Sequence, residues 1–183
     1  MPSEIQLPSG AVLRPLALGD AAALASAYTV NRDHLAPWDP VRSEAFFTAA
    51  VQGVEIERLL LDQDEGRAVP FVLVAAESGE IVGRVNLSGI VRGVFHSANL
   101  GYWVDARLAG RGVMSAAVEA VAHIARTETR LHRLQAGTLL HNAASQAVLR
   151  HTGFTEIGIA PDYLFIAGRW QDHRLFQRIL YAA

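Results

Sequence analysis

The sequence predicts a single mixed α+β domain built from short strands, most of them antiparallel, and a few helices. Its length of 183 residues fits one domain, since domains average roughly 150 residues. Apolar residues make up 51% and charged residues 19% of the chain, as in an ordinary folded domain. The hydrophobic pattern switches between the two-residue period of strands and the longer period of helices, in the order β-α-α-β-β-β-α-β-α-β-β. We therefore expect one domain spanning residues 1–183.

The first third of the chain contains alternating apolar patterns and clear helix signals. We expect a strand at 11–16, helices at 20–30 and 43–61, a loop at 31–40 and a solvated acidic turn at 62–66. Asp20 and Ser43 stand where helix N-caps are expected. The loop carries Trp38 between two prolines.

The remainder alternates between strands and two further helices. We expect strands at 69–77, 80–87, 98–104, 133–140, 163–166 and 174–180, and helices at 113–126 and 142–151. Ser78 and Gly79 form a tight-turn signal, so the first two of these strands should be a hairpin. The helix at 113–126 should join two parallel strands, which gives one crossover in an otherwise antiparallel sheet.

Composition excludes several classes of chemistry. The chain has no cysteine, which removes disulfides, thiolate metal sites and acyl-cysteine intermediates. Its formal net charge of −2 argues against nucleic-acid or anionic membrane binding. The seven histidines show no metal-ligand spacing, and no serine-hydrolase elbow is present. The absence of cysteine and of metal-ligand spacing leads us to expect no metal. Neither a signal peptide nor an apolar run of bilayer length is found, so we expect a cytoplasmic protein.

The most informative stretch runs from Val104 to Met114, where a strand ends, a glycine-rich turn follows and a helix begins. Backbone N–H groups at such a helix start have no intrahelical partner and can hold a phosphate. Arg107 and Arg111 add positive charge, while Gly110 and Gly112 let the backbone approach a ligand closely.

Four interpretations of this turn compete. A Walker loop is excluded because Val113 and Met114 stand where the lysine and hydroxyl residues are needed. A dinucleotide fingerprint is a near miss, because Ser115 replaces its third glycine and no acidic residue ends the next strand. A turn with a purely structural role and a CoA-type pyrophosphate site remain open.

The order of motifs carries a family resemblance. The segment Arg107-x-x-Gly110-x-Gly112 resembles the signature of the GCN5-related N-acetyltransferase (GNAT) superfamily. Asn142, Ser145 and the pair Gly153-Phe154 are similar to a segment of the branch that acetylates protein N-termini. Runs at 91–96, 100–102, 162–164 and 168–173 resemble the ribosomal-protein-alanine N-acetyltransferase branch, so the resemblance covers 13–180.

The resemblance implies the GNAT fold, a central mixed, mostly antiparallel sheet flanked by helices and splayed between two parallel strands, here 100–104 and 133–140. Acetyl-CoA would lie between these strands. Its pantetheine would pair with the backbone of Val104 and contact Asn142. Ser145 would donate a hydrogen bond to the departing thiolate as the catalytic residue and would also contact the cofactor. The pyrophosphate would lie on Arg107, Leu108, Ala109, Gly110, Arg111, Gly112 and Val113.

Each of these residues also has an ordinary structural role to weigh. Asn142 is a good helix N-cap, which is compatible with a ligand contact. Trp38 and Tyr163 could line an acceptor pocket together with Asn99 and Tyr102, yet aromatic residues are more often core residues. Asp172 and His173 look like a catalytic couple, but adjacent strand residues point to opposite faces.

The implied activity is acetyl-CoA-dependent transfer of acetyl to a primary amine, with the N-terminal α-amine of a protein as the expected acceptor. An α-amine of pKa about 7.7 to 8.0 is partly neutral at pH 7 and needs only a modest base. The strand 98–104 contains no carboxylate, which leaves Tyr102, Asn99, His96 and water as candidates. Alternatives are a small-amine acetyltransferase, acting on an aminoglycoside or polyamine, and a non-catalytic acyl-CoA-binding module. A homodimer is left open.

Overall fold

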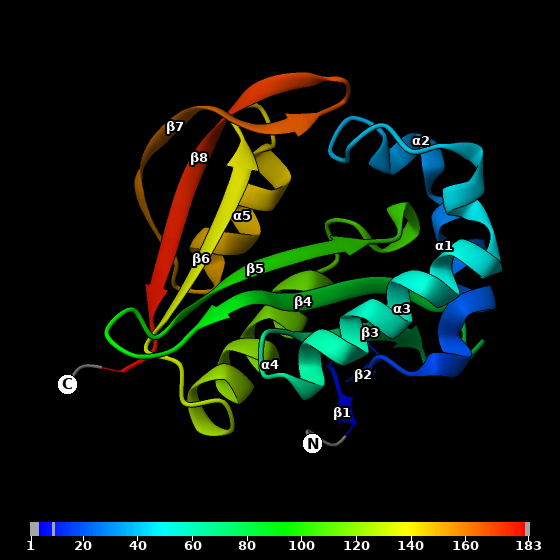
Figure 1. Cartoon of the computed structure of the whole chain (residues 1–183), viewed down its shortest axis with the longest axis horizontal. Helices are drawn as coiled ribbons and strands as arrows, with labels where there is room; N and C mark the ends of the chain where they lie inside the picture. The colour runs from blue at the N-terminus through cyan, green and yellow to red at the C-terminus, as the bar shows by residue number, and fades with distance from the viewer. Residues whose placement is uncertain (1–3, 9, 182–183) are drawn as a thin grey trace.

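The computed structural model describes residues 4–8 and 10–181, and its centre is one eight-stranded sheet (Figure 1). The strands lie in the order β1-β2-β3-β4-β5-β6-β8-β7. Their bounds are β1 Ile5–Gln6, β2 Ala11–Pro15, β3 Val69–Ala75, β4 Ile81–Val91, β5 Ser97–Val104, β6 Arg133–Leu139, β7 Thr155–Ile166 and β8 Arg169–Ile179.

The strand pairs are antiparallel with one exception. β5 and β6 run parallel, and helix α4 (Val113–Thr127) connects them as the predicted crossover. The tight turn at Ser78 and Gly79 joins β3 to β4 as an antiparallel hairpin, with Gly79 at φ +71°. The mixed, mostly antiparallel α+β sheet is therefore confirmed.

Helices cover both faces of this sheet (Figure 1). The other α-helices are α1 Ala21–Val30, α2 Arg32–Leu35, α3 Ala49–Asp64 and α5 Ala143–His151. Buried side chains of α1 and α3 form the smaller core cluster, with Val72 and Ile81 from the sheet. Helix α4 fills the larger cluster on the opposite face, where its buried residues recur at helical spacing and Leu149 of α5 joins them.

Asp20 is the N-cap residue of α1 as predicted but makes no side-chain capping hydrogen bond, and the cap predicted at Ser43 is wrong. Asp20 ends a short 3-10 turn, η1 (Leu18–Asp20), and its carboxylate accepts from both terminal guanidinium nitrogens of Arg14 at 2.7 and 2.8 Å. Ser43 precedes another 3-10 turn, η2 (Glu44–Phe47), and α3 begins later. Thr48 caps α3, because its hydroxyl accepts from the Val51 N–H at 3.4 Å.

The C-terminal strands and the Trp38 loop also differ from expectation. β7 begins at Thr155 rather than 163, because two register shifts absorb the turn residues Gly158, Pro161 and Asp162 within an edge strand. β8 begins at Arg169, five residues before the predicted strand, and its partner is this lengthened β7. The loop at 31–40 contains the four-residue helix α2. None of the helices in the described ranges is long and apolar enough to span a membrane.

Candidate active site

The parallel strands β5 and β6 separate soon after they meet. They pair only at Ser97 with Arg133, Ala98 with Leu134 and Asn99 with Gln135, and Figure 1 shows them diverging beyond that point. β5 continues along β4, while β6 continues along β8. The splayed strands predicted from the family resemblance are therefore present.

The backbone edge of β5 that faces β6 is left without a strand partner beyond this seam. The Asp105 N–H donates to the carbonyl of Val82 in β4 at 2.8 Å. Backbone groups alternate between the two edges of a strand, so those of Tyr102 and Val104 point to the opposite edge, toward β6. An extended ligand could pair with this edge as a further strand would.

A turn with two left-handed glycines follows β5. It contains the 3-10 helix η3 (Ala106–Leu108), then Gly110 at φ +73° and Gly112 at φ +78°, the residue before α4. A Cβ added at either glycine would meet no atom within 4 Å, so the backbone here borders open space. Gly112 has no side chain to cap α4, which leaves the first-turn N–H groups available to an anion.

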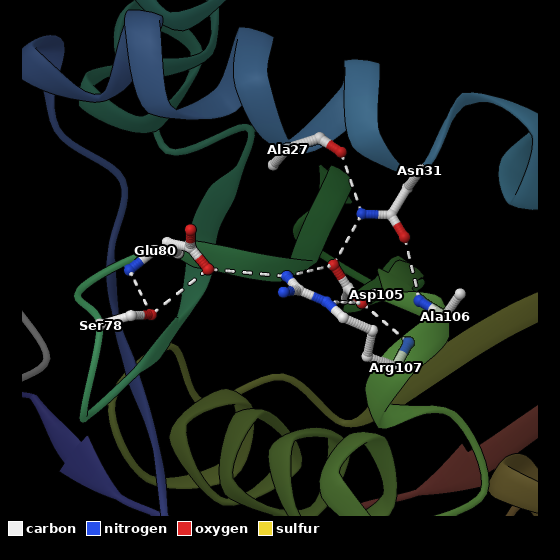
Figure 2. A network of polar contacts seen from close by, with 7 residues as sticks. All are labelled: Ala27, Asn31, Ser78, Glu80, Asp105, Ala106 and Arg107. Carbon is white, nitrogen blue, oxygen red and sulfur yellow. Dashed lines mark hydrogen bonds and ion pairs between the residues drawn. The ribbon is translucent and has the colours of Figure 1, made fainter.

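A buried amide anchors the start of this turn to helix α1 (Figure 2). Asn31 is 2% exposed and stands at the junction of α1 and α2. Its Nδ2 donates to the carbonyl of Ala27 at 3.0 Å and to Oδ2 of Asp105 at 2.9 Å. Its Oδ1 accepts from the backbone N–H of Ala106 at 2.9 Å. No pattern in the sequence indicates this long-range contact.

Asp105 is the second member of this network. It is 2% exposed, and Arg107 donates to it from Nε, Nη2 and the backbone N–H at 2.8 to 2.9 Å. The hydrogen bond from the Arg107 side chain, together with that from Asn31 and the Arg107 backbone, lowers the pKa of Asp105 to about 2 against the opposing effect of burial. Asp105 is therefore a fixed anion at the base of the turn.

The guanidinium of Arg107 is already engaged within the protein. Besides Asp105, it reaches the carboxylate of Glu80 in the β3–β4 turn at 3.6 Å, and Figure 2 shows it pointing that way. The exposed side chain of Arg111 forms no ion pair among the described residues. Both the side chain and the backbone N–H of Arg107 are therefore engaged with Asp105, and Arg111 is the arginine of this turn without an ion pair among the described residues.

A pair of hydroxyls bridges the two sides of the opening. Tyr102 on β5 lies 2.8 Å from the Ser145 hydroxyl on α5 and donates to the Ser145 carbonyl at 3.1 Å. Asn142 caps α5, since its Oδ1 accepts from the Ser145 N–H at 3.0 Å, as the sequence predicted. Burial raises the pKa of Tyr102 to about 12, although the Ser145 contact opposes this, so the phenol stays protonated at neutral pH.

The predicted acceptor residues lie on different elements. Trp38 is half-buried with its ring 5.3 Å from that of His141, just before Asn142, which brings the α2 loop to the start of α5. Asn99 is exposed at the last paired position of β5. The ring of Tyr163 contacts that of His173 across the β7–β8 hairpin in a tilted arrangement, with 5.5 Å between the ring centres.

Asp172 and His173 do not form a catalytic couple. His173 is 3% exposed and its Nδ1 lies 2.9 Å from the carbonyl of Gln171. Asp172 is exposed on the other face and accepts from the backbone N–H of Asp162 at 3.0 Å. Their opposite orientations confirm the expectation from strand alternation.

Comparison with known proteins agrees with this geometry. A family model described as an acetyltransferase (GNAT) domain matches residues 11–155. The chain belongs to the GNAT acetyltransferase family. Among its relatives, the [ribosomal protein uS5]-alanine N-acetyltransferase of Escherichia coli is 36% identical over 156 residues, which cover 85% of this chain and 80% of that protein.

Solved GNAT structures extend the similarity to nearly the whole fold. The ribosomal-protein-S5-alanine acetyltransferase of Vibrio fischeri is 34% identical with a TM-score of 0.92, and 97% of each chain is covered. RimJ of Mycobacterium smegmatis, in complex with CoA-disulfide, is 32% identical with a TM-score of 0.88, covering 97% of this chain and 86% of that one. The chain is a GNAT-type acetyltransferase closely related to ribosomal-protein N-acetyltransferases.

Proposed function

We propose that this enzyme transfers an acetyl group from acetyl-CoA directly to the α-amine of a protein N-terminus, acting as one domain in the cytoplasm. The observation that carries the proposal is the opening between β5 and β6, bordered by the glycine turn and by the Tyr102–Ser145 pair. A relative of known structure holds CoA-disulfide, and others are named for acetylating a ribosomal protein's alanine, which supports both substrates.

The residues around the opening fit acetyl-CoA. The glycine turn and the first turn of α4 would hold the pyrophosphate through the residues from Arg107 to Val113, with Arg111 as the charged partner. The unpaired backbone at Val104 would bind the pantetheine amides as a strand does. Asn142 uses its Oδ1 for the cap of α5, so its Nδ2 would donate to the pantetheine.

In the transfer step, the neutral amine nitrogen attacks the thioester carbonyl, the carbon–nitrogen bond forms, the carbon–sulfur bond breaks and the amine loses its proton to solvent. Ser145 would donate a hydrogen bond to the departing thiolate. Tyr102 supports this role, because its hydroxyl lies 2.8 Å from that of Ser145 and either one can donate. When the phenolic hydrogen turns from the Ser145 carbonyl to the Ser145 hydroxyl oxygen, the serine hydrogen is left for the thiolate. A phenol of pKa about 12 is a hydrogen-bond donor at neutral pH and not the base.

The acceptor would meet the cofactor between the α2 loop and the β7–β8 hairpin, where Trp38, Asn99 and Tyr163 lie. Strands β4, β5 and β6 contain no carboxylate among their residues. The enzyme therefore depends on an amine that is partly neutral by itself, as an α-amine is at pH 7 and a lysine is not.

The test compares acceptors that differ only in the amine. The protein is incubated with acetyl-CoA and a peptide with a free N-terminal alanine, or the same peptide with a blocked N-terminus and one lysine, while free thiol and product mass are followed. We expect acetylation of the α-amine. CoA binding without thiol release would favour an acyl-CoA-binding module, and turnover of polyamines or aminoglycosides alone would favour a small-amine acetyltransferase.

A further inference from the structure

One arginine on the sheet is buried without an anionic partner. Arg84 in β4 is 7% exposed. Its Nη1 donates to the Tyr28 hydroxyl at 3.3 Å and its Nη2 to Oδ1 of Asn86 at 3.5 Å, both long for a charged donor. Its Nε is buried and has no hydrogen-bond partner. A buried cation served only by distant neutral groups is unfavourable unless an anion completes its environment.

No carboxylate of the described residues forms an ion pair with Arg84, although other arginines of this chain have such partners. Asp20 is a carboxylate on which the charge of Arg84 acts, but its oxygens already accept from Arg14 at 2.7 and 2.8 Å and from the Ala17 N–H at 2.9 Å. Arg84 therefore has no ion-pair partner among the described residues, and Asp20 acts on it only through space.

The position of Arg84 places it on the acceptor side of the sheet. Tyr102 and Val104 pack toward α4, where the glycine turn and Ser145 also lie, so a cofactor approaches from that face. The alternate β5 residues Gly101 and Trp103 point to the opposite face, and they pair with Asn86 and Arg84 in β4.

Open space lies beside Gly101, two residues along β5 from Trp103, the strand partner of Arg84. A Cβ at Gly101 would meet no atom within 4 Å, and Gly101 lies directly beside Asn86, to which the Arg84 guanidinium reaches. Two residues along a strand span about 7 Å, the length of an extended dipeptide. An acceptor amine above Gly101 would thus place a side chain of its first three residues near Arg84.

We propose that Arg84 forms an anion subsite that binds an acidic side chain within the first three residues of the acceptor. This inference rests on the proposed function and adds the chemical class of the acceptor. The charge of the face agrees with it, since Arg133 on the same side donates only to neutral oxygens, those of Gln177, Gln135 and Ser97. β4, β5 and β6 carry these two guanidinium groups and no carboxylate, which disfavours polycationic amines along these strands.

The experiment uses three peptides with a free N-terminal alanine that differ at the next two positions, carrying glutamate, glutamine or lysine. For the wild-type protein we expect kcat/KM to be about tenfold to a hundredfold higher with glutamate than with glutamine, the range of one charge-assisted hydrogen bond. Arg84→Gln should abolish this ratio, and Arg84→Lys should keep part of it. Equal use of glutamate and glutamine, or a preference for lysine, overturns the proposal.

Two controls keep the test decisive. Arg178→Gln removes an arginine from the opposite face, where it pairs with Glu119 at 2.6 Å, and should leave the glutamate preference intact. A preference that survives Arg84→Gln in a folded, CoA-binding protein also overturns the proposal. Peptide binding to the CoA complex, measured by calorimetry, is independent of turnover. If no peptide is acetylated the proposed function fails, whereas equal binding of the glutamate and glutamine peptides refutes the anion subsite by itself.

Discussion

Replacing Asn31 with alanine tests whether the hydrogen bonds between this residue at the end of α1 and the start of the glycine turn set the geometry of that turn. The change removes hydrogen bonds to Ala27, Asp105 and Ala106. The carboxylate oxygen Oδ2 of Asp105 and the backbone N–H of Ala106 both lose the Asn31 amide as a partner. Two of these hydrogen bonds join neutral groups, and each contributes about 1 kcal/mol to the free energy of unfolding. The third is accepted by a carboxylate and contributes about 1.5 to 3 kcal/mol. Because contacts of one residue are not additive, we expect a loss of about 3 kcal/mol in the free energy of unfolding.

These hydrogen bonds should matter for ligand binding as well as for stability. Without the hydrogen bond from the Ala106 N–H to Asn31, the start of the glycine turn is no longer held in one position. We therefore expect the Kd for CoA to rise about tenfold, which corresponds to about 1.4 kcal/mol of binding free energy. Urea unfolding gives the stability and calorimetry gives the Kd. The matched control is Gln52→Ala, another side chain only 1% exposed, whose amide donates to the Phe46 carbonyl at 2.7 Å far from the turn.

The two variants separate a general loss of stability from a local effect. Gln52→Ala should lower stability by about 1 to 2 kcal/mol and leave CoA affinity unchanged. If Asn31→Ala binds CoA as tightly as the wild type, or if both variants weaken binding equally, the Asn31 hydrogen bonds do not position the turn and the reasoning is refuted.

Four further predictions follow from the site. Tyr102→Phe should lower kcat about tenfold or more with little change in the KM for acetyl-CoA, and Tyr102→Phe with Ser145→Ala should be no worse than Ser145→Ala alone, because the hydroxyls act as one unit. Gly112→Ala should weaken CoA binding at least tenfold by calorimetry, whereas Gly93→Ala, at a similar φ of +70° remote from the turn, should change only stability. The pKa of Asp105 is lowered to about 2, chiefly by Arg107. The ionised carboxylate therefore adds at most about 2 kcal/mol to the free energy of unfolding above pH 4, and this contribution is lost as the pH falls to 2. Acid unfolding of the wild type and of Asp105→Asn would show the difference. Trp38→Ala should raise the KM for the peptide acceptor and leave that for acetyl-CoA unchanged.

The sequence allowed prediction of those features that depend on neighbours along the chain. The amphipathic helix α4, the Ser78-Gly79 hairpin and the Asn142 cap are local patterns, and all three are present. The parallel crossover followed from chain order and handedness. Asp20 holds the predicted N-cap position, but its side chain does not cap α1, because Arg14, six residues earlier, is a stronger partner for the carboxylate than the helix N–H groups are.

What the sequence could not show are contacts between distant segments. Asn31 meets Asp105 across 74 positions. Asn31 lies outside every motif, and the stretch that contains Asp105 gives no indication of a partner at the end of α1. The bond between Tyr102 and Ser145 depends on how β5 and α5 face each other, which periodicity does not encode. In the sequence Arg84 has the pattern of an ordinary charged residue in a half-exposed strand. Its burial without a carboxylate partner depends on how α1 and α3 pack on the sheet, which the sequence pattern does not show.

The short pairing of β5 with β6 divides the sheet into two parts, called wings here: β1 to β5 form one, and β6, β8 and β7 form the other. Beyond Asn99 and Gln135 the wings are connected by the Tyr102–Ser145 contact and by packing, and the facing backbone edge of β5 lacks a strand partner. A pantetheine arm in this gap would act as a ninth, non-peptide strand. Cofactor binding would then also complete the fold, and at a ligand concentration of 100 times Kd it adds about 2.7 kcal/mol to the stability of the joined wings.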